Sequence, residues 1–341
     1  MERKSSRFQS QSSENPQRDE ISLGEIMDHF LVKVEELHSS PAVIWRVLQL
    51  LKDPDFDVRD VELMLEADPA LSAAILRLVN SSAYGLPQKI TSLRQAILLL
   101  GARSLRLAVL SFGLVDRLTR GTPAKVYEDF WRRALTTAST ASRLARTYRT
   151  TNPDEAYCAG LLAELGVLVL AQVDTRRYTR VYLTRRHGED LCPAEQARYG
   201  FDHAALGERL LVRWSLPQPL AQVAGTHHQL VGTPEALHAV VHAGALLSDV
   251  LWMPQSVLLP HARQWLSDHF QIDLDGFINL AMDCKQDILD NAEMFSIHLD
   301  GKIDIDLLRR EALRQFRQVA LETCLEYDAM TAVLNQDMDI C

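Results

Sequence analysis

The 341-residue sequence has few cysteines, and no two of them form a C-x-x-C pair. The five are scattered at positions 158, 192, 284, 324 and 341, which argues against a disulfide scaffold or a cysteine-based zinc site. Such usage is typical of a reducing compartment, so we expect a cytoplasmic protein. The sequence also has no apolar run of about 18 residues, and no apolar segment follows the charged N-terminus. It therefore predicts neither a membrane span nor a secretory signal.

Signals for β-structure are equally scarce. Few segments alternate with period two, and none carries a hairpin turn. Helical signals are abundant instead: Asp68 and Pro69 suit a helix start, and apolar residues 71, 75, 78 and 79 then recur at gaps of three and four. Gly101 indicates a break within a later helical stretch. The sequence predicts an all-α fold.

Charge is unevenly distributed along the chain. The formal net charge is -9, yet residues 132–186 hold ten Arg and Lys against four Asp and Glu, and residues 268–341 hold six against sixteen. An arginine-rich segment can bind phosphates or nucleic acid. The same segment can also be a solvated face, or can dock on the acidic C-terminal part of the chain. The negative net charge makes nucleic acid the less favoured partner.

The pattern divides the chain into regions. Residues 1–20 are polar and are predicted to be disordered. Residues 21–249 form the main helical domain, 250–303 an acidic helical extension, and 304–327 a single helix. That helix carries an apolar stripe, which fits either the seam of a weak homodimer or packing against its own domain. The stripe consists of Ile305, Leu308, Ala312, Phe316 and Val319.

The stretch "AGLLAELGVLVL" (residues 159–170) reads as a buried helix with one carboxylate, Glu164, set into it. A carboxylate inside an apolar core needs a partner, because burying an unpaired charge is costly. A partner for Glu164 is therefore expected elsewhere in the chain.

Four motifs in order resemble the HDOD domain. They are "DPALSAAILRLVNSSAYG" (68–85), "ITSLRQAILLLGARSLRLAVLSFGL" (90–114), "AYCAGLLAELGVLVL" (156–170) and "YGFDHAALGERLLVRWSLP" (199–217), with "HH" beyond them. The resemblance covers roughly residues 23–245. It implies two helical subdomains and a bacterial signalling module, distantly related to the HD metal-dependent phosphohydrolases but usually without their metal site.

The resemblance also places the former metal positions. HD hydrolases use an adjacent His–Asp pair, an upstream His and a final Asp to hold a metal that activates water. Here the pair falls on Ala163 and Glu164, the upstream His on Arg133 and the final Asp on Ala245. Alanine cannot be a ligand and arginine repels a cation, so we expect no metal, no cofactor and no catalysis. We expect Arg133 to form an ion pair with Glu164; the alternative is that Glu164 faces water.

Three histidines remain near these motifs: His203, His227 and His228. Comparable histidines bind a second metal in HD hydrolases with larger sites. Adjacent residues on a helix point about 100° apart, so His227 and His228 are not expected to serve one ion easily. Structural histidines, a ligand pocket and a metal site remain the three alternatives, with the first favoured.

The end of the chain offers a second resemblance. "YDAMTAVLNQ" (327–336) looks like the entry into a GGDEF diguanylate cyclase domain, with Asp328, Thr331 and Asn335 matching. This implies that residues 328–341 begin such a domain, and that the chain controls an output in cyclic-di-GMP signalling. We therefore expect a non-enzymatic regulatory module that acts on protein partners or an attached output domain. The alternatives are a divergent phosphohydrolase and a nucleic-acid-binding regulator.

Overall fold

The computed structural model describes residues 22–37, 42–51, 53, 55–80, 84, 86–110, 112–113, 119, 121–184, 191–214, 216–229, 234–294 and 297–318. Within these ranges the chain forms helices and no strand, so the predicted all-α fold is confirmed. The predicted disordered tail (1–20) and the GGDEF-like end (328–341) lie outside the described residues.

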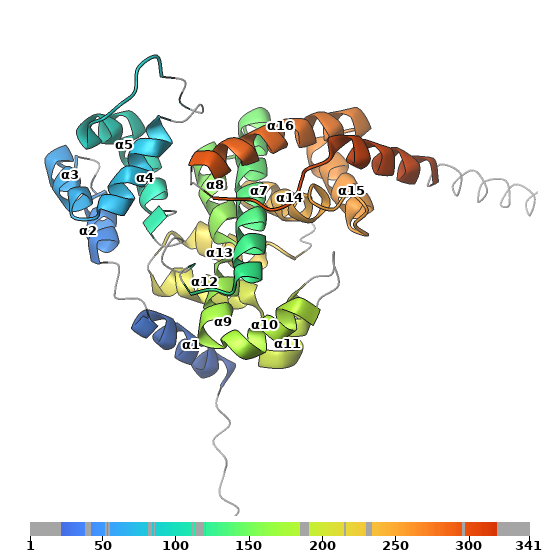
Figure 1. The fold of residues 1–341 in the computed structure, drawn as a ribbon, viewed down its shortest axis with the longest axis horizontal. Helices are drawn as coiled ribbons and strands as arrows, with labels where there is room; N and C mark the ends of the chain where they lie inside the picture. Colours follow the sequence, from blue (N-terminus) through green and yellow to red (C-terminus); the bar gives the residue numbers. More distant parts are fainter. Residues whose placement is uncertain are drawn as a thin grey trace, which may run out of the picture.

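The helices form two groups, shown in Figure 1. One group contains α2 to α5, and the other contains α7 to α16, with α1 packed on α9 and α12 of the second group. This agrees with the two helical subdomains that the resemblance implies. The bounds are α1 Leu23–Leu37, α2 Ala42–Leu50, α3 Val58–Glu66, α4 Pro69–Val79, α5 Leu93–Leu110, α7 Ala124–Tyr148, α8 Pro153–Leu162, α9 Leu165–Val173, α10 Thr175–Thr184, α11 Cys192–Tyr199, α12 His203–Arg213, α13 Gln218–Thr226, α14 Ala236–Val250, α15 Leu259–Phe270 and α16 Leu274–Met294.

Local signals set the helix starts and breaks of the smaller group. Asp68 accepts a hydrogen bond from the backbone N–H of Leu71 at 3.1 Å and Pro69 opens α4, as the sequence predicts. Gly101 has φ 69° and ψ 171°, so α5 is broken where the glycine indicated. Asn80 then ties the end of α4 to Ile90 through two side-chain hydrogen bonds of 2.7 Å.

The larger group is built around α7, whose 25 residues are packed against α8, α14 and α16. Gly160 allows α8 to lie close to α7, because a Cβ there would come within 2.8 Å of the Ala138 backbone. The stretch 159–170, which the sequence predicts to be one helix, belongs to two helices. Helix α8 ends at Leu162, and α9 begins at Leu165 after a turn at Ala163 and Glu164. The turn places Glu164 at the junction of two buried helices.

The segment Pro153–Val173 corrects the observation that the sequence has no long apolar run. By length and composition it is apolar enough to cross a membrane, although the sequence was read as having no such run. However, 83% of its most apolar 18 residues are buried inside the fold. This segment, α8 with α9, is core material of the helical domain.

The arginine-rich segment docks in part on the acidic C-terminal region, one of the alternatives left open. Arg143 on α7 donates hydrogen bonds to both carboxylate oxygens of Asp287 at 2.6 and 2.8 Å, and another to Asp283 at 3.0 Å. Arg132 bonds the carbonyl of Asp300 at 3.3 Å. These contacts involve two of the ten basic residues of the segment, and they bind α16 and the following segment to α7.

The centre of the C-terminal stripe packs against its own domain, one of the two alternatives that the sequence left open. Helix 305–318 buries Leu308 and Ala312 completely in the common core, and Arg263 of α15 donates a hydrogen bond to the Ala312 carbonyl at 3.2 Å. Ile305 is half-buried, whereas Phe316 is 53% exposed beside Arg263. Apolar burial within the chain therefore already uses the centre of the stripe. Val319 and the rest of the predicted helix to residue 327 lie outside the described residues.

Candidate functional site

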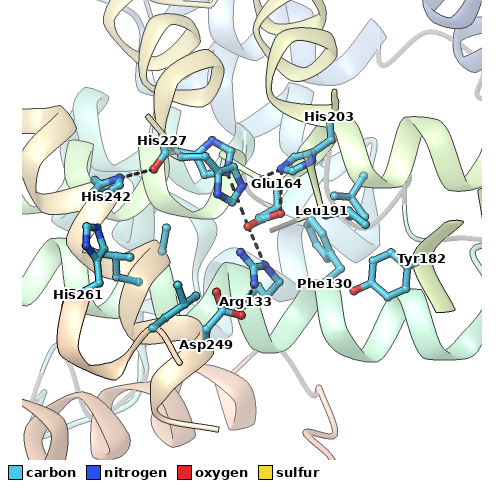
Figure 2. Close-up of a pocket in the computed structure, with 15 residues that line it drawn as sticks. Phe130, Arg133, Glu164, Tyr182, Leu191, His203, His227, His242, Asp249 and His261 are labelled. Carbon is cyan, nitrogen blue, oxygen red and sulfur yellow. Dashed lines mark hydrogen bonds and ion pairs between the residues drawn. The ribbon is translucent and has the colours of Figure 1, made fainter. Parts of the chain in front are cut away.

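A cavity of about 150 Å³ lies in the larger group, among α7, the α8–α9 junction, α12, the end of α13 and α14 (Figure 2). Most of the positions singled out from the sequence line it: Arg133, Glu164, His203, His227, His228 and Ala245. Ala163 does not; it is fully buried in the core. Six of the seven positions singled out from the sequence thus lie around one cavity.

Arg133 occupies one side of the pocket, between two carboxylates. Its Nε donates to Glu164 Oε1 at 2.8 Å, the pair that the sequence predicts, and its Nη1 donates to Asp249 Oδ1 at 2.7 Å. Burial acts to lower the pKa of this guanidinium, but Asp249 and Glu164 outweigh it, so the pKa is raised and Arg133 stays charged. Glu164 thus serves to hold Arg133 across the α7–α9 contact.

Asp249 was missed by sequence reasoning, which placed the final acidic position on Ala245. The two residues are four apart on α14, so they share one face of the helix, and both line the pocket. A search one turn along the helix from Ala245 would have found the carboxylate.

The same ion pairs explain the ionisation of Glu164, which is 2% exposed. Burial alone would raise its pKa, but the charge of Arg133, followed by the neighbouring His227 and His203, holds the pKa well below its usual range. An HD-type metal does not fit here, because Arg133 is bonded to Glu164 while Ala163 and Ala245 have no donor atoms. No step of chemistry follows from such a metal.

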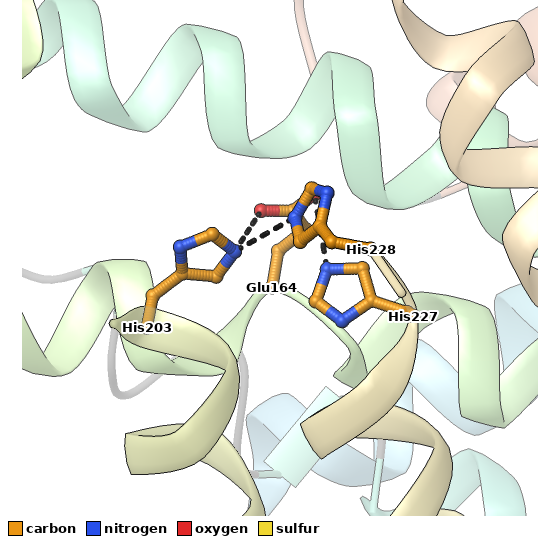
Figure 3. A group of neighbouring side chains, drawn as sticks. All are labelled: Glu164, His203, His227 and His228. Carbon is orange, nitrogen blue, oxygen red and sulfur yellow. Dashed lines mark hydrogen bonds and ion pairs between the residues drawn. The ribbon is translucent and has the colours of Figure 1, made fainter. Parts of the chain in front are cut away.

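The opposite side of the pocket carries three histidines (Figure 3). His203 is the first residue of α12, after the N-cap Asp202, and both its backbone N–H and its Nδ1 lie 2.7 Å from Glu195 Oε2. Its Nε2 lies 3.0 Å from His228 Nε2 and 3.5 Å from Glu164 Oε2. Burial acts to lower the His203 pKa, but the Glu195 carboxylate outweighs it and the pKa is well raised.

Gly166 permits this arrangement, because a Cβ there would collide with the carbonyl oxygen of His203. The start of α9 therefore meets the start of α12 without a side chain between them, and Glu164 comes within reach of the imidazole. Glu195, which orients His203, was also missed by sequence reasoning. It is fully buried, and Tyr178 donates a hydrogen bond of 2.6 Å to its second oxygen.

His227 and His228 converge on the same point, which corrects the expectation that adjacent rings diverge. Because α13 ends at Thr226, the two histidines lie in a turn and the helical angle of about 100° does not apply. Their ring centroids are 4.0 Å apart. Burial, and then the neighbouring His227 and His203, hold the pKa of His228 well below its usual range.

Two histidines of α14 hold this turn from behind. His242 Nδ1 donates to the His227 carbonyl at 2.7 Å, and His238 Nε2 donates to the Thr226 carbonyl at 2.9 Å. Burial lowers the pKa of His242 to about 4, so its ring is neutral at ordinary pH. The turn carrying His227 and His228 is therefore fixed to α14 through its backbone.

Comparisons with known proteins agree with this architecture. The HDOD domain model matches residues 37–230, which is 194 of the 341 residues. An uncharacterized protein of Treponema pallidum (strain Nichols) is 25% identical over 207 residues, which cover 60% of this chain and 40% of that protein. The match thus spans less than half the length of this relative.

Two solved structures show the same fold. An HDOD domain protein of unknown function from Geobacter sulfurreducens is 24% identical, with a TM-score of 0.59 over 85% of this chain and 96% of that one. A protein from Marinobacter aquaeolei VT8, for which a role in signal transduction has been proposed, is 23% identical, with a TM-score of 0.61 over 80% of this chain and 65% of that one. Motifs, fold and family model agree: the chain belongs to the HDOD domain family.

Proposed function

We propose that this HDOD domain is a non-catalytic regulatory module of bacterial signal transduction, acting on protein partners or on an attached output domain. The observation that carries the proposal is the position of Arg133, bonded at 2.8 Å to Glu164 and at 2.7 Å to Asp249. The protein's own cation sits between the two carboxylates on this side of the pocket, at the position where the resemblance places a metal-binding histidine.

A guanidinium cannot replace such a metal chemically. Metal-assisted hydrolysis needs a Lewis acid that lowers the pKa of bound water. Arginine has five N–H donors, no acceptor and no vacant coordination position, and it stays protonated. It bonds the two carboxylates and compensates one of their two charges without activating water, so the pocket keeps its shape without the hydrolytic chemistry.

The finer part of the proposal concerns the output. The GGDEF-like residues 328–335 favour control of a diguanylate cyclase in cyclic-di-GMP signalling, in the cytoplasm. They follow helix 305–318, whose last described residues lie at the edge of the bundle in Figure 1, where a further domain has room. A GGDEF domain encoded directly after Cys341 would support this part, and an unrelated downstream reading frame would contradict it.

The absence of catalysis is tested by incubating the purified chain with cyclic dinucleotides, ppGpp and nucleotide monoesters in the presence of Mn²⁺, Mg²⁺ or Fe²⁺. We expect no turnover above buffer. His298→Ala is a matched control, because His298 lies far outside the pocket residues in the sequence and its side chain is 90% exposed. Turnover that persists in this control and is abolished by His203→Ala would overturn the proposal.

A further inference from the structure

The histidine side of the pocket brings four potential ligands together. Glu164, His203, His227 and His228 each offer one atom, and these atoms all lie within 4.8 Å of one another. Three separations are 3.0 Å (His203 Nε2 to His228 Nε2), 3.5 Å (His203 Nε2 to Glu164 Oε2) and 3.7 Å (His227 Nε2 to Glu164 Oε1). Ligands held at zinc distances of about 2.0–2.1 Å in a tetrahedron lie about 3.3 Å from each other. The separations in the structure are therefore close to those between the ligands of a tetrahedral site.

His227 is held in the tautomer that a metal requires. Its Nδ1 donates to the Ala224 carbonyl at 2.8 Å, which leaves the lone pair on Nε2. The residue is 0% exposed, and Nε2 has no hydrogen-bond partner among the described atoms. Leaving a buried hydrogen-bond acceptor unsatisfied costs stability. An unpaired nitrogen that faces a polar pocket therefore indicates that a group able to accept its lone pair, such as a metal ion, binds there.

His203 shows the second feature of a metal-binding histidine. Its Nδ1 bonds Glu195 at 2.7 Å, while its Nε2 faces the pocket. Carboxylate–histidine pairs of this kind orient metal ligands and increase their basicity. Arg133 acts similarly on Glu164: it occupies Oε1 and leaves Oε2 facing His203.

The charges of the neighbourhood favour a divalent cation. Histidines that bind a metal are neutral, so in the metal-bound state the charged groups in and around the cluster are the carboxylates of Glu164, Glu195 and Asp249 and the guanidinium of Arg133. Three negative charges and one positive charge leave two negative charges uncompensated. A divalent ion at the cluster would balance them, where unpaired buried charge is otherwise costly.

We propose that Glu164, His203, His227 and His228 bind one divalent transition-metal ion of the zinc class in a closed four-ligand site. Four protein ligands fill a tetrahedral shell, which is the arrangement of structural rather than catalytic zinc sites. The ion joins the junction of α8 and α9, the start of α12 and the turn after α13. It stabilises or switches the module without activating water, so the proposal is compatible with the proposed function but does not depend on it.

The test is a titration of chelator-treated full chain with Co²⁺, followed by competition with Zn²⁺. We expect one equivalent of Co²⁺, the intense visible bands of four-coordinate cobalt, and displacement by zinc. His228→Gln should weaken binding more than about 100-fold, beyond the effect of an outer-shell partner, and Glu195→Gln by about 10–100-fold. His298→Ala should bind like the unmodified chain.

His228 is only half-buried, so the His228→Gln chain should fold even where substitution of the buried His203 does not. Circular dichroism of each variant establishes this. Absence of stoichiometric binding, or equal affinity in His228→Gln and His298→Ala, would overturn the metal site and leave the proposed function intact. Hydrolysis by the zinc-loaded chain would instead overturn the proposed function and leave the metal site standing.

Discussion

The two sides of the pocket stabilise the buried Glu164 carboxylate with different kinds of side chain. On the α7 and α14 side, Arg133, a cation that belongs to the chain, bonds both Glu164 and Asp249. On the α12 and α13 side, three histidines surround Glu164 with ring nitrogens, whose charge, unlike that of an arginine, depends on protonation. Glu164 is shared between the sides: Oε1 bonds Arg133 and lies 3.7 Å from His227 Nε2, and Oε2 faces His203.

The difference indicates that the arginine side of the pocket serves packing, whereas the histidine side can bind a ligand. On the arginine side, the three charged groups are hydrogen-bonded to one another and join helices. The histidine side contains an unsatisfied buried nitrogen, His227 Nε2, and therefore retains a capacity to bind. A pocket can thus lose its hydrolytic chemistry on one side while keeping ligand atoms on the other.

The largest effect is expected from breaking the arginine side. Arg133→Ala leaves two carboxylates without their cation and should destabilise the fold by about 3–5 kcal/mol in urea unfolding. Replacing Arg133 and Glu164 together by apolar residues should recover part of the loss. Arg177→Ala is the control: that side chain is 67% exposed, and its removal should cost less than about 1 kcal/mol. Additive losses in the double variant would show that the two side chains do not interact.

A smaller loss of stability is expected from a substitution at the contact between α9 and α12, where the arginine side and the histidine side of the pocket meet. Gly166→Ala should destabilise by about 1–3 kcal/mol, because the new Cβ must push α9 away from the His203 backbone. Gly207→Ala, across the same contact, is the matched control: its Cβ would meet its nearest atom at 3.4 Å, so little should change. Thermal unfolding of the pair measures the difference, and equal stability would contradict the close approach described here.

The ion pairs between α7 and α16 should contribute less to stability than Arg133 or Gly166. Arg143 is partly exposed, as are Asp283 and Asp287, so solvent screens these ion pairs. Arg143→Ala should cost about 0.5–1 kcal/mol, which urea unfolding beside Arg133→Ala would show. A loss as large as that of Arg133→Ala would mean that the two arginines do not differ in the way their burial indicates.

No effect on association is expected from the exposed end of the stripe. Leu308 and Ala312 are already buried within the chain, so Phe316→Asp should sediment like the unmodified protein. Sedimentation velocity over a range of concentrations measures this. A dimer of the unmodified chain that the substitution abolishes would restore the interpretation of the stripe as a seam.

Local chemistry explains what the sequence predicted well. The N-cap at Asp68 and the break at Gly101 depend on residues next to one another, and the family motifs placed Arg133 and Glu164 opposite each other. The convergence of His227 and His228 depends on where α13 ends. The role of Glu195 depends on how α11 packs against α12, which helical periodicity does not specify.

The central claim is that the arginine side is closed and the histidine side binds an ion. Anomalous X-ray scattering from crystals of the zinc-loaded chain tests it most directly. The account predicts one ion bound by Glu164, His203, His227 and His228, with Arg133 still bonded to Glu164 and Asp249. An ion lying instead between Glu164 and Asp249, with Arg133 displaced and a water molecule in an open position, would contradict it.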